Sequence, residues 1–116
     1  MQHTETSEIQ FDDFLKVDIR AGTILEASPN PKAHKPAYIL KIDFGDMGIK
    51  TSSAQITENY QPEQLIGKQI VAVMNFPAKR VAGIKSEVLV LGCVNETSAV
   101  VLLQPSHEVI NGSRIL

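Results

Sequence analysis

The chain has 116 residues, of which 43% are hydrophobic, and a formal net charge of −2 at pH 7. This length and composition favour one soluble globular domain over residues 1–116, with a packed core and no need for disulfides. The slightly negative net charge excludes a protein that binds polyanions over its whole surface. The apolar stretches are too short to cross a membrane, and the start of the chain is polar and acidic, unlike a signal peptide. We therefore expect a cytoplasmic protein without membrane insertion.

The amino-terminal part of the chain predicts a helical turn followed by a long strand. Three apolar residues have a spacing that fits one or two turns of helix: Ile9, Phe11 and Phe14. From Leu15 to Leu25 apolar and polar residues alternate, which predicts a half-buried strand with both of these leucines on its buried face. Gly22 predicts a bend or bulge in this strand. Residues 28–36 contain three prolines and predict an exposed connection.

The middle of the chain predicts a β-meander. Residues 37–44 form a strand that places four apolar side chains at alternate positions: Tyr38, Leu40, Ile42 and Phe44. Residues 45–48 begin and end with glycine and predict a turn into a third strand at residues 49–54. Pro62 opens a short helical turn at residues 62–65, where its missing amide donor costs nothing.

Two short apolar runs bounded by glycine predict a fourth strand at residues 70–74 and a fifth at residues 88–91, joined by a basic loop. Residues 99–103 predict one more strand. The chain has one cysteine, Cys93, which extends the fifth apolar run, so we expect it to be a small buried side chain.

This order of elements predicts an all-β fold, a five-stranded Greek-key OB-fold barrel with short helical segments. We expect the barrel over residues 14–92, an amino-terminal extension at residues 1–13 and a carboxy-terminal extension at residues 93–116. The extensions carry more apolar side chains than a small barrel can cover, which predicts a homodimer interface. The predicted interface residues are Ile9, Phe11, Phe14, Val109, Ile110, Ile115 and Leu116. The alternative is that they cap the openings of their own barrel.

Basic residues gather in the two connections that flank the ligand face of an OB-fold barrel, residues 28–36 and 76–85. Neither connection contains an acidic residue. Their cations are Lys32, Lys35, Lys79, Arg80 and Lys85. Four polar residues at nearby strand ends add hydrogen-bonding groups that suit backbone or phosphate contacts: Ser52, Ser53, Gln55 and Asn75. The alternative interpretation is that these cations only keep exposed loops soluble.

The second connection also carries an apolar patch made by Phe76, Pro77, Val81 and Ile84. A patch of this kind, ringed by cations, suits a peptide with apolar and polar parts. Core closure at the mouth of the barrel is an equally good interpretation of Val81 and Ile84. Phe76 is the one aromatic residue in the two connections, so base stacking explains this surface poorly.

The sequence predicts neither an enzyme nor a metal or cofactor site. The three histidines are far apart in sequence, and none has a partner at the spacing of metal ligands. Glu87 could serve as a general base, but no nucleophile lies near it in the sequence.

Four segments resemble one known family: residues 18–24, 52–56, 75–92 and 102–105. They are similar to the CsaA family of bacterial export-related chaperones, part of a wider tRNA-binding OB-fold group that includes the carboxy-terminal domain of bacterial methionyl-tRNA synthetase. The resemblance implies a dimeric cytoplasmic protein that binds unfolded polypeptides or preproteins, with the secretion ATPase as a candidate partner. Glu87, Val88 and Leu89 match the chaperone branch.

The resemblance also implies a rival ligand. Some motif positions are shared with the tRNA-binding relatives: Asn75, Lys79, Arg80, Gly83 and Ser86. The leading hypothesis is therefore a polypeptide-binding chaperone, and the alternative is a structure-selective tRNA-binding protein.

Overall fold

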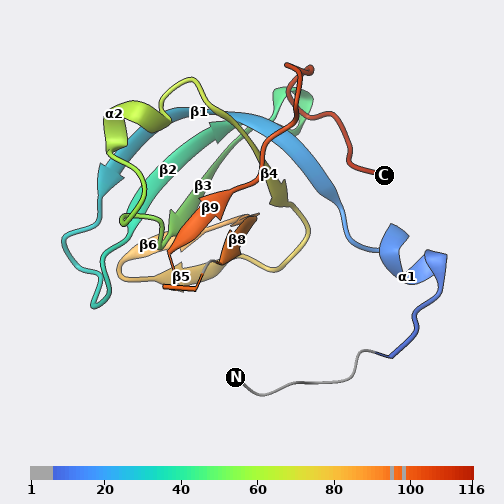
Figure 1. Cartoon of the computed structure of the whole chain (residues 1–116), viewed down its shortest axis with the longest axis horizontal. Helices are drawn as coiled ribbons and strands as arrows, with labels where there is room; N and C mark the ends of the chain where they lie inside the picture. The colour runs from blue at the N-terminus through green and yellow to red at the C-terminus, as the bar shows by residue number, and fades with distance from the viewer. Residues whose placement is uncertain (1–6, 95, 98) are drawn as a thin grey trace.

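The computed structural model describes residues 7–94, 96–97 and 99–116 and contains a five-stranded antiparallel sheet in the order β3-β2-β1-β4-β7 (Figure 1). The strands are β1 (Ile19–Pro29), β2 (Tyr38–Asp43), β3 (Ile49–Ala54), β4 (Gln69–Val73) and β7 (Leu89–Val90). The two edges of the sheet meet where Glu87 N–H donates to the carbonyl oxygen of Thr51 at 2.7 Å. The sheet is thereby nearly closed, and the predicted five-stranded OB-fold barrel is confirmed.

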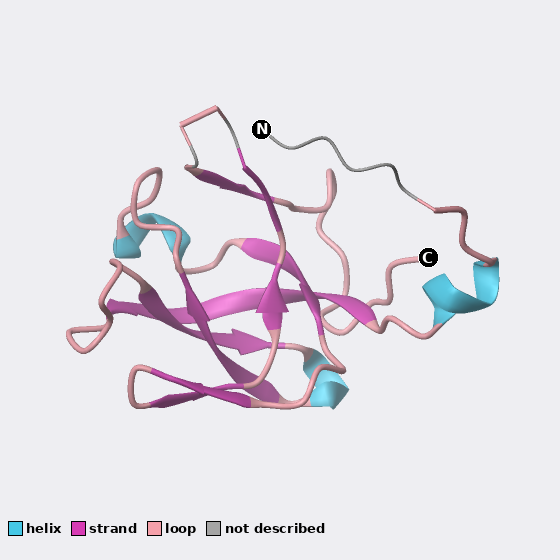
Figure 2. Cartoon of the chain, turned by 90° about the horizontal axis from the view of Figure 1, so that it is seen from below, coloured by secondary structure: helices cyan, strands magenta, loops and turns pink. Residues whose placement is uncertain are grey.

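Two short hairpins and three short helices complete the described structure. The hairpins pair β5 (Lys79–Val81) with β6 (Ile84–Ser86), and β8 (Gly92–Val94) with β9 (Val100–Leu102). The helices are α1 (Phe11–Leu15), the 3-10 helix η1 (Gly45–Met47) and α2 (Pro62–Leu65). Figure 2 shows both hairpins at the periphery of the barrel and α1 extending away from it. Among the described residues, no helix combines the length and apolarity needed to span a membrane.

The core of the barrel is centred on β2, whose predicted alternation is confirmed. Leu40, Ile42 and Phe44 are fully buried, and burial of each side chain of this size contributes about 1.5–3 kcal/mol. Phe44 packs directly against β1, because a Cβ atom added to Gly22 would lie 2.6 Å from Cδ1 of Phe44. Glycine is therefore required at this position for close packing of the two strands, whereas the bulge predicted there occurs elsewhere.

The first strand differs from the prediction at both ends. Leu15 is the last residue of α1, and the strand begins at Ile19. The helix is stabilised by Asp13, whose carboxylate accepts from Gln10 N–H at 3.0 Å. The pairing register of β1 with β2 shifts between Ile24 and Glu26, which marks a β-bulge. Before this bulge the inward face of β1 carries Gly22, which faces Phe44, and Ile24, which pairs with Ile42 and is fully buried. Leu25, which we expected on the buried face, is 39% exposed, so the predicted face of this strand is wrong.

The predicted helical turn after the third strand is confirmed as α2. Pro62 occupies the start of the helix, where no intrahelical donor is needed. Gln61 N–H donates to the side-chain oxygen of Gln64 at 2.9 Å and so satisfies one of the free amides at this end.

The carboxy-terminal segment pairs with the first half of β1. Ala21 N–H donates to Ser113 O at 2.9 Å, Gly112 N–H donates to Ala21 O at 2.8 Å, and Ile115 N–H donates to Ile19 O at 2.8 Å. These bonds satisfy backbone groups of β1 that β2 does not reach. The extension therefore lies beside β1 where β2 does not, and Ile110 and Leu116 within it are both 85% exposed.

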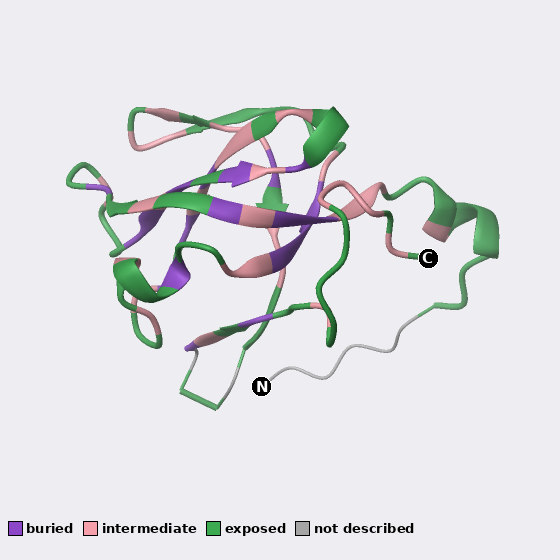
Figure 3. Ribbon diagram, turned by 90° about the horizontal axis from the view of Figure 1, so that it is seen from above, coloured by how far each residue is buried: buried purple, intermediate pink, exposed green. Residues whose placement is uncertain are grey.

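Several of the predicted interface residues are exposed rather than folded over the barrel openings. Ile110 and Leu116 are each 85% exposed, and Ile9 and Phe11 are 68% and 69% exposed. Val109 is also exposed, whereas Phe14 and Ile115 are half-buried. Figure 3 shows α1 as an exposed helix beside the chain's own carboxy-terminal segment.

Cys93 is exposed, so the prediction of a buried thiol is wrong. After β7 the chain leaves the barrel and forms β8, which pairs with β9. Cys93 lies opposite Val101, which is 45% exposed, whereas the neighbouring pair places Leu102 in the core. The apolar run therefore continues past the barrel into a hairpin with one solvent-facing side.

Candidate functional site

The segment between β4 and β7 contains a β-hairpin, where the sequence led us to expect a basic loop. β5 and β6 pair with Val81 opposite Ile84, so Ala82 and Gly83 form a two-residue turn. Both turn residues have positive φ, +46° at Ala82 and +86° at Gly83, as a type I′ turn requires. The hairpin gives the basic segment a regular strand geometry.

Because side chains alternate along a strand, the hairpin has two faces of different chemistry. The register places Lys79 opposite Ser86 and Val81 opposite Ile84, and these four residues define the inner face. Arg80 lies opposite Lys85, and this pair defines the outer face. The cations predicted to form one cluster are therefore divided between the two faces.

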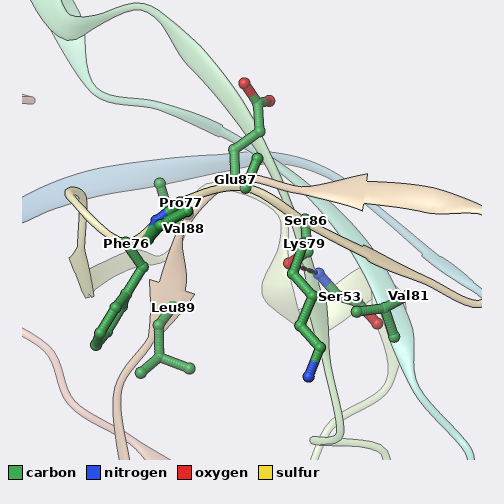
Figure 4. Close-up of a pocket in the computed structure, with 10 residues that line it drawn as sticks. Ser53, Phe76, Pro77, Lys79, Val81, Ser86, Glu87, Val88 and Leu89 are labelled. Atoms are coloured by element: carbon green, nitrogen blue, oxygen red, sulfur yellow. Dashed lines mark hydrogen bonds between the residues drawn. The ribbon is translucent and has the colours of Figure 1, made fainter.

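An apolar groove of about 490 Å³ lies beside the inner face. It is lined by Ser53, Phe76, Pro77, Ala78, Lys79, Val81, Ser86, Glu87, Val88 and Leu89. Figure 4 shows Phe76 and Leu89 side by side at one end of this groove and Lys79 near Val81 at the other. Phe76 is 57% exposed and Leu89 is 50% exposed, so both offer apolar surface to a ligand.

A second, cationic groove of about 560 Å³ lies between the hairpin tip and the loop before β2. It is lined by Lys32, Ala33, His34, Lys35, Ala37, Ser53, Gln55, Val81 and Ala82. Ser53 and Val81 line both grooves, so the apolar and cationic grooves are adjacent. The ion pairs found in the described part of the chain join Lys16 to Asp13, and Arg20 and Arg114 to Asp18, so none of them involves the five predicted cations.

Between the two grooves, β3 contacts residues 86–88 along a seam. Side chains form part of the hydrogen bonding there, in place of backbone groups. Ser53 N–H donates to Ser86 Oγ at 3.1 Å, and Thr51 N–H donates to Glu87 Oε1 at 3.0 Å. Ser52 Oγ donates to the carbonyl oxygen of Val88 at 2.9 Å. Ser86 and Glu87 thus close the barrel against β3, and the carboxylate of Glu87 serves as a hydrogen-bond acceptor for the backbone.

Asn75 lies outside both grooves, and its side chain binds the amino-terminal segment. Its Oδ1 accepts from Asp18 N–H at 2.9 Å, and its Nδ2 donates to Lys16 O at 2.7 Å. The amide therefore fixes the link between α1 and β1, while the next residue, Phe76, lines the apolar groove.

The structure divides the predicted site residues into three groups. Ser53, Phe76, Lys79 and Ser86 line the apolar groove, and Lys32, Lys35, Ser53 and Gln55 line the cationic groove. Asn75, Arg80, Ile84 and Lys85 line neither groove.

Sequence reasoning missed two residues of this region, Leu89 and Asn30. Leu89 follows the buried Val88, so strand alternation would have placed it on the outside. Asn30 is 8% exposed, and its Oδ1 accepts from Lys32 N–H at 3.0 Å, a local turn that a Pro-Asn-Pro sequence favours. Within the described ranges, no group of three or more His, Cys, Asp or Glu side chains is arranged to hold a metal ion.

Comparison with known families matches residues 19–114 to a family described as a putative tRNA binding domain. The chain belongs to this family. Among solved structures, the CsaA chaperone of Bacillus anthracis is 58% identical with a TM-score of 0.90, over 95% of this chain and 100% of that one. The CsaA chaperone protein of Picrophilus torridus is 51% identical with a TM-score of 0.87, over 94% of this chain and 100% of that one. The resemblance to the CsaA family that the sequence indicated is confirmed.

Methionine–tRNA ligases are also similar to this chain. The enzyme of Bacteroides fragilis is 38% identical over 109 residues, and that of Porphyromonas gingivalis is 39% identical over 108 residues. The matches cover 94% and 93% of this chain but only 16% of each ligase. The similarity is therefore with one small part of each enzyme.

Proposed function

We propose that the chain is a non-enzymatic molecular chaperone that binds unfolded or export-bound polypeptides in the cytoplasm. The observation that carries this proposal is the apolar groove, in which Phe76 and Leu89 are both at least half exposed next to the inner face of the hairpin. An unfolded polypeptide presents apolar side chains that gain about 25 cal/mol for each Å² buried there. The likeness to two CsaA chaperones supports the same conclusion.

The groove suits an extended segment better than a folded surface. Phe76 and Leu89 offer apolar contacts at one end, and Lys79 at the other end can cover apolar surface with its stem while its charge stays in water (Figure 4). Preproteins on the export route, with the secretion ATPase as partner, are the clients that the proposal implies.

Suppression of aggregation tests this function. Wild-type protein at stoichiometric amounts should suppress aggregation of a chemically unfolded model protein. Phe76→Ala with Leu89→Ala should remove most of this effect, because loss of both apolar contacts weakens binding by at least about tenfold. The matched control is Ile66→Ala, which truncates a residue that is 56% exposed and lies outside both grooves. No suppression by the wild type, or equal suppression by the double variant, would contradict the proposal.

The alternative is tRNA binding. It is favoured by the family match and by five cations that form none of the described ion pairs. Titration of tRNA at several salt concentrations tests it, because three or more phosphate contacts give a log–log slope of about −2 or steeper. Weak binding with a flat salt response would remove tRNA as a ligand.

We also propose that the chain forms a homodimer through its two extensions. Their exposed apolar residues include Phe11 and Ile110, which are 69% and 85% exposed. Phe11→Asp with Ile110→Asp should halve the molar mass measured by light scattering, because two buried charges would oppose association. An unchanged mass for this variant would place the interface elsewhere, and a monomeric wild type would remove the dimer.

A further inference from the structure

One buried amide connects the loop before β2 to the tip of the β5–β6 hairpin. Asn30 is 8% exposed, although it is polar and lies in a connection between strands. A buried amide needs hydrogen-bond partners, and both ends of this one have them. Its Oδ1 accepts from Lys32 N–H at 3.0 Å, and its Nδ2 donates to the carbonyl oxygen of Ala82 at 3.3 Å. The same side chain therefore shapes the loop and holds the hairpin.

The hairpin tip is adapted to this contact. Ala82 has φ +46°, a left-handed conformation that residues with a Cβ atom adopt at an energetic cost. A Cβ atom added to Gly83 would lie 3.2 Å from Cδ and 3.6 Å from Nζ of Lys32. The aliphatic stem of Lys32 thus rests on the tip, and glycine leaves the room for it.

We propose that Asn30 is a positioning residue for ligand binding, which holds Lys32 and Lys35 beside the hairpin so that the loop and the tip form one surface. The cationic groove takes Lys32 and Lys35 from the loop, and Val81 and Ala82 from the hairpin. Without the hydrogen bond from Asn30, the loop and the hairpin on the two sides of this groove lose a side-chain link. Lys32 and Lys35 can then move away from the hairpin. This inference rests on the proposed function and identifies Asn30 as the residue that sets the shape of the site.

A double-mutant cycle tests the proposal. The probe is reduced and carboxymethylated lactalbumin, a permanently unfolded polypeptide, followed by fluorescence anisotropy. Asn30→Ala and the pair Lys32→Ala with Lys35→Ala should each weaken probe binding by about three- to tenfold, as expected for loss of two exposed charges. Both should flatten the salt dependence of binding by the same amount. Asn30→Ala added to the lysine pair should change affinity by less than about twofold, because the residues act as one unit.

Asn111→Ala is the matched control. Asn111 Oδ1 accepts from Thr23 Oγ1 at 2.7 Å, a side-chain bond that also joins two segments distant in sequence, and Asn111 lines neither groove. Its loss should leave probe affinity and salt dependence unchanged. Additive losses for Asn30→Ala and the lysine pair, or an Asn30→Ala variant with wild-type affinity, would overturn the proposal.

Amide hydrogen exchange separates this inference from the proposed function. Asn30→Ala should speed exchange both in the loop, at Ala33, and next to the hairpin tip, at Ile84. Faster exchange in the loop alone would overturn the link, because it would reveal only the local turn to Lys32. If the wild type binds no probe, the proposed function fails, and the exchange result alone decides whether Asn30 holds the two segments together.

Discussion

The inner and outer faces of the β5–β6 hairpin carry different chemistry, although their residues alternate along the same two short strands. The inner face adds Val81 and Lys79 to the apolar groove, and the outer face places Arg80 directly opposite Lys85. An irregular loop would mix these side chains, whereas a strand separates them. The comparison shows how one short segment can offer an apolar surface and a separate cationic surface.

The largest expected effect comes from exchanging the two faces at one position. Arg80→Val with Val81→Arg keeps composition and net charge but moves a cation into the apolar groove. Affinity for an unfolded polypeptide should fall by at least about tenfold, because the groove would lose the apolar side chain of Val81 and gain a second cation beside Lys79. Arg80→Lys with Lys85→Arg is the control and should bind normally in the same anisotropy titration. Normal binding by the exchange variant would show that the order of these residues does not matter.

Removal of the two cations on the outer face should weaken the binding of polyanions selectively. Arg80→Ala with Lys85→Ala should reduce the magnitude of the tRNA salt slope by about 1.4 to 1.8, as expected for two lost phosphate contacts. Polypeptide affinity should stay within about twofold, since neither side chain lines the apolar groove. Parallel titrations with tRNA and with the unfolded polypeptide measure both affinities. Equal losses of affinity for the two ligands would show that the two faces form one site.

A smaller effect is expected at the seam that supports the inner face. Glu87→Ala should lower the free energy of unfolding by about 1–2 kcal/mol, because Thr51 N–H loses its acceptor at Oε1. Glu87→Gln keeps a side-chain oxygen and should stay within about 0.5 kcal/mol of the wild type. Urea denaturation measures both. Equal destabilisation by the two variants would mean that the charge of Glu87, rather than its hydrogen bond, holds the seam.

The smallest effect concerns the stability of the outer face. Like charges directly opposite each other destabilise a strand pair, so Lys85→Glu should raise the free energy of unfolding by about 0.2–1 kcal/mol through a pair with Arg80. The same variant should bind tRNA less well than the wild type. Urea denaturation and tRNA titration measure the two quantities, and a loss of stability would show that the two side chains do not face each other.

Much of the barrel could be predicted because its strands alternate strongly. Leu40, Ile42 and Phe44 were identified by their period of two, and Pro62 identified the start of α2. Leu25 was placed on the wrong face, because the inward face of β1 carries Gly22 and Ile24, and a glycine gives no apolar signal in the alternation.

The hairpin at the candidate site was harder to predict. Type I′ turns usually contain Asn-Gly or Asp-Gly, and this one contains Ala82 and Gly83, so the usual signal is missing. The sequence indicated which segments carry the cations, but the separation of Lys79 from Arg80 depends on a strand geometry that only the structure shows. Asn75 has the residue type of a ligand contact, yet its amide is occupied by backbone groups distant in sequence.

The exposed thiol of Cys93 makes the chain suitable for site-specific labelling. The sequence contains one cysteine, and β8, which carries it, follows directly after β7, which supplies Leu89 to the apolar groove. A maleimide dye therefore couples to the natural sequence at a single position, with no engineered residue. Such a conjugate is a fluorescent form of the chain that can itself be titrated with an unlabelled ligand.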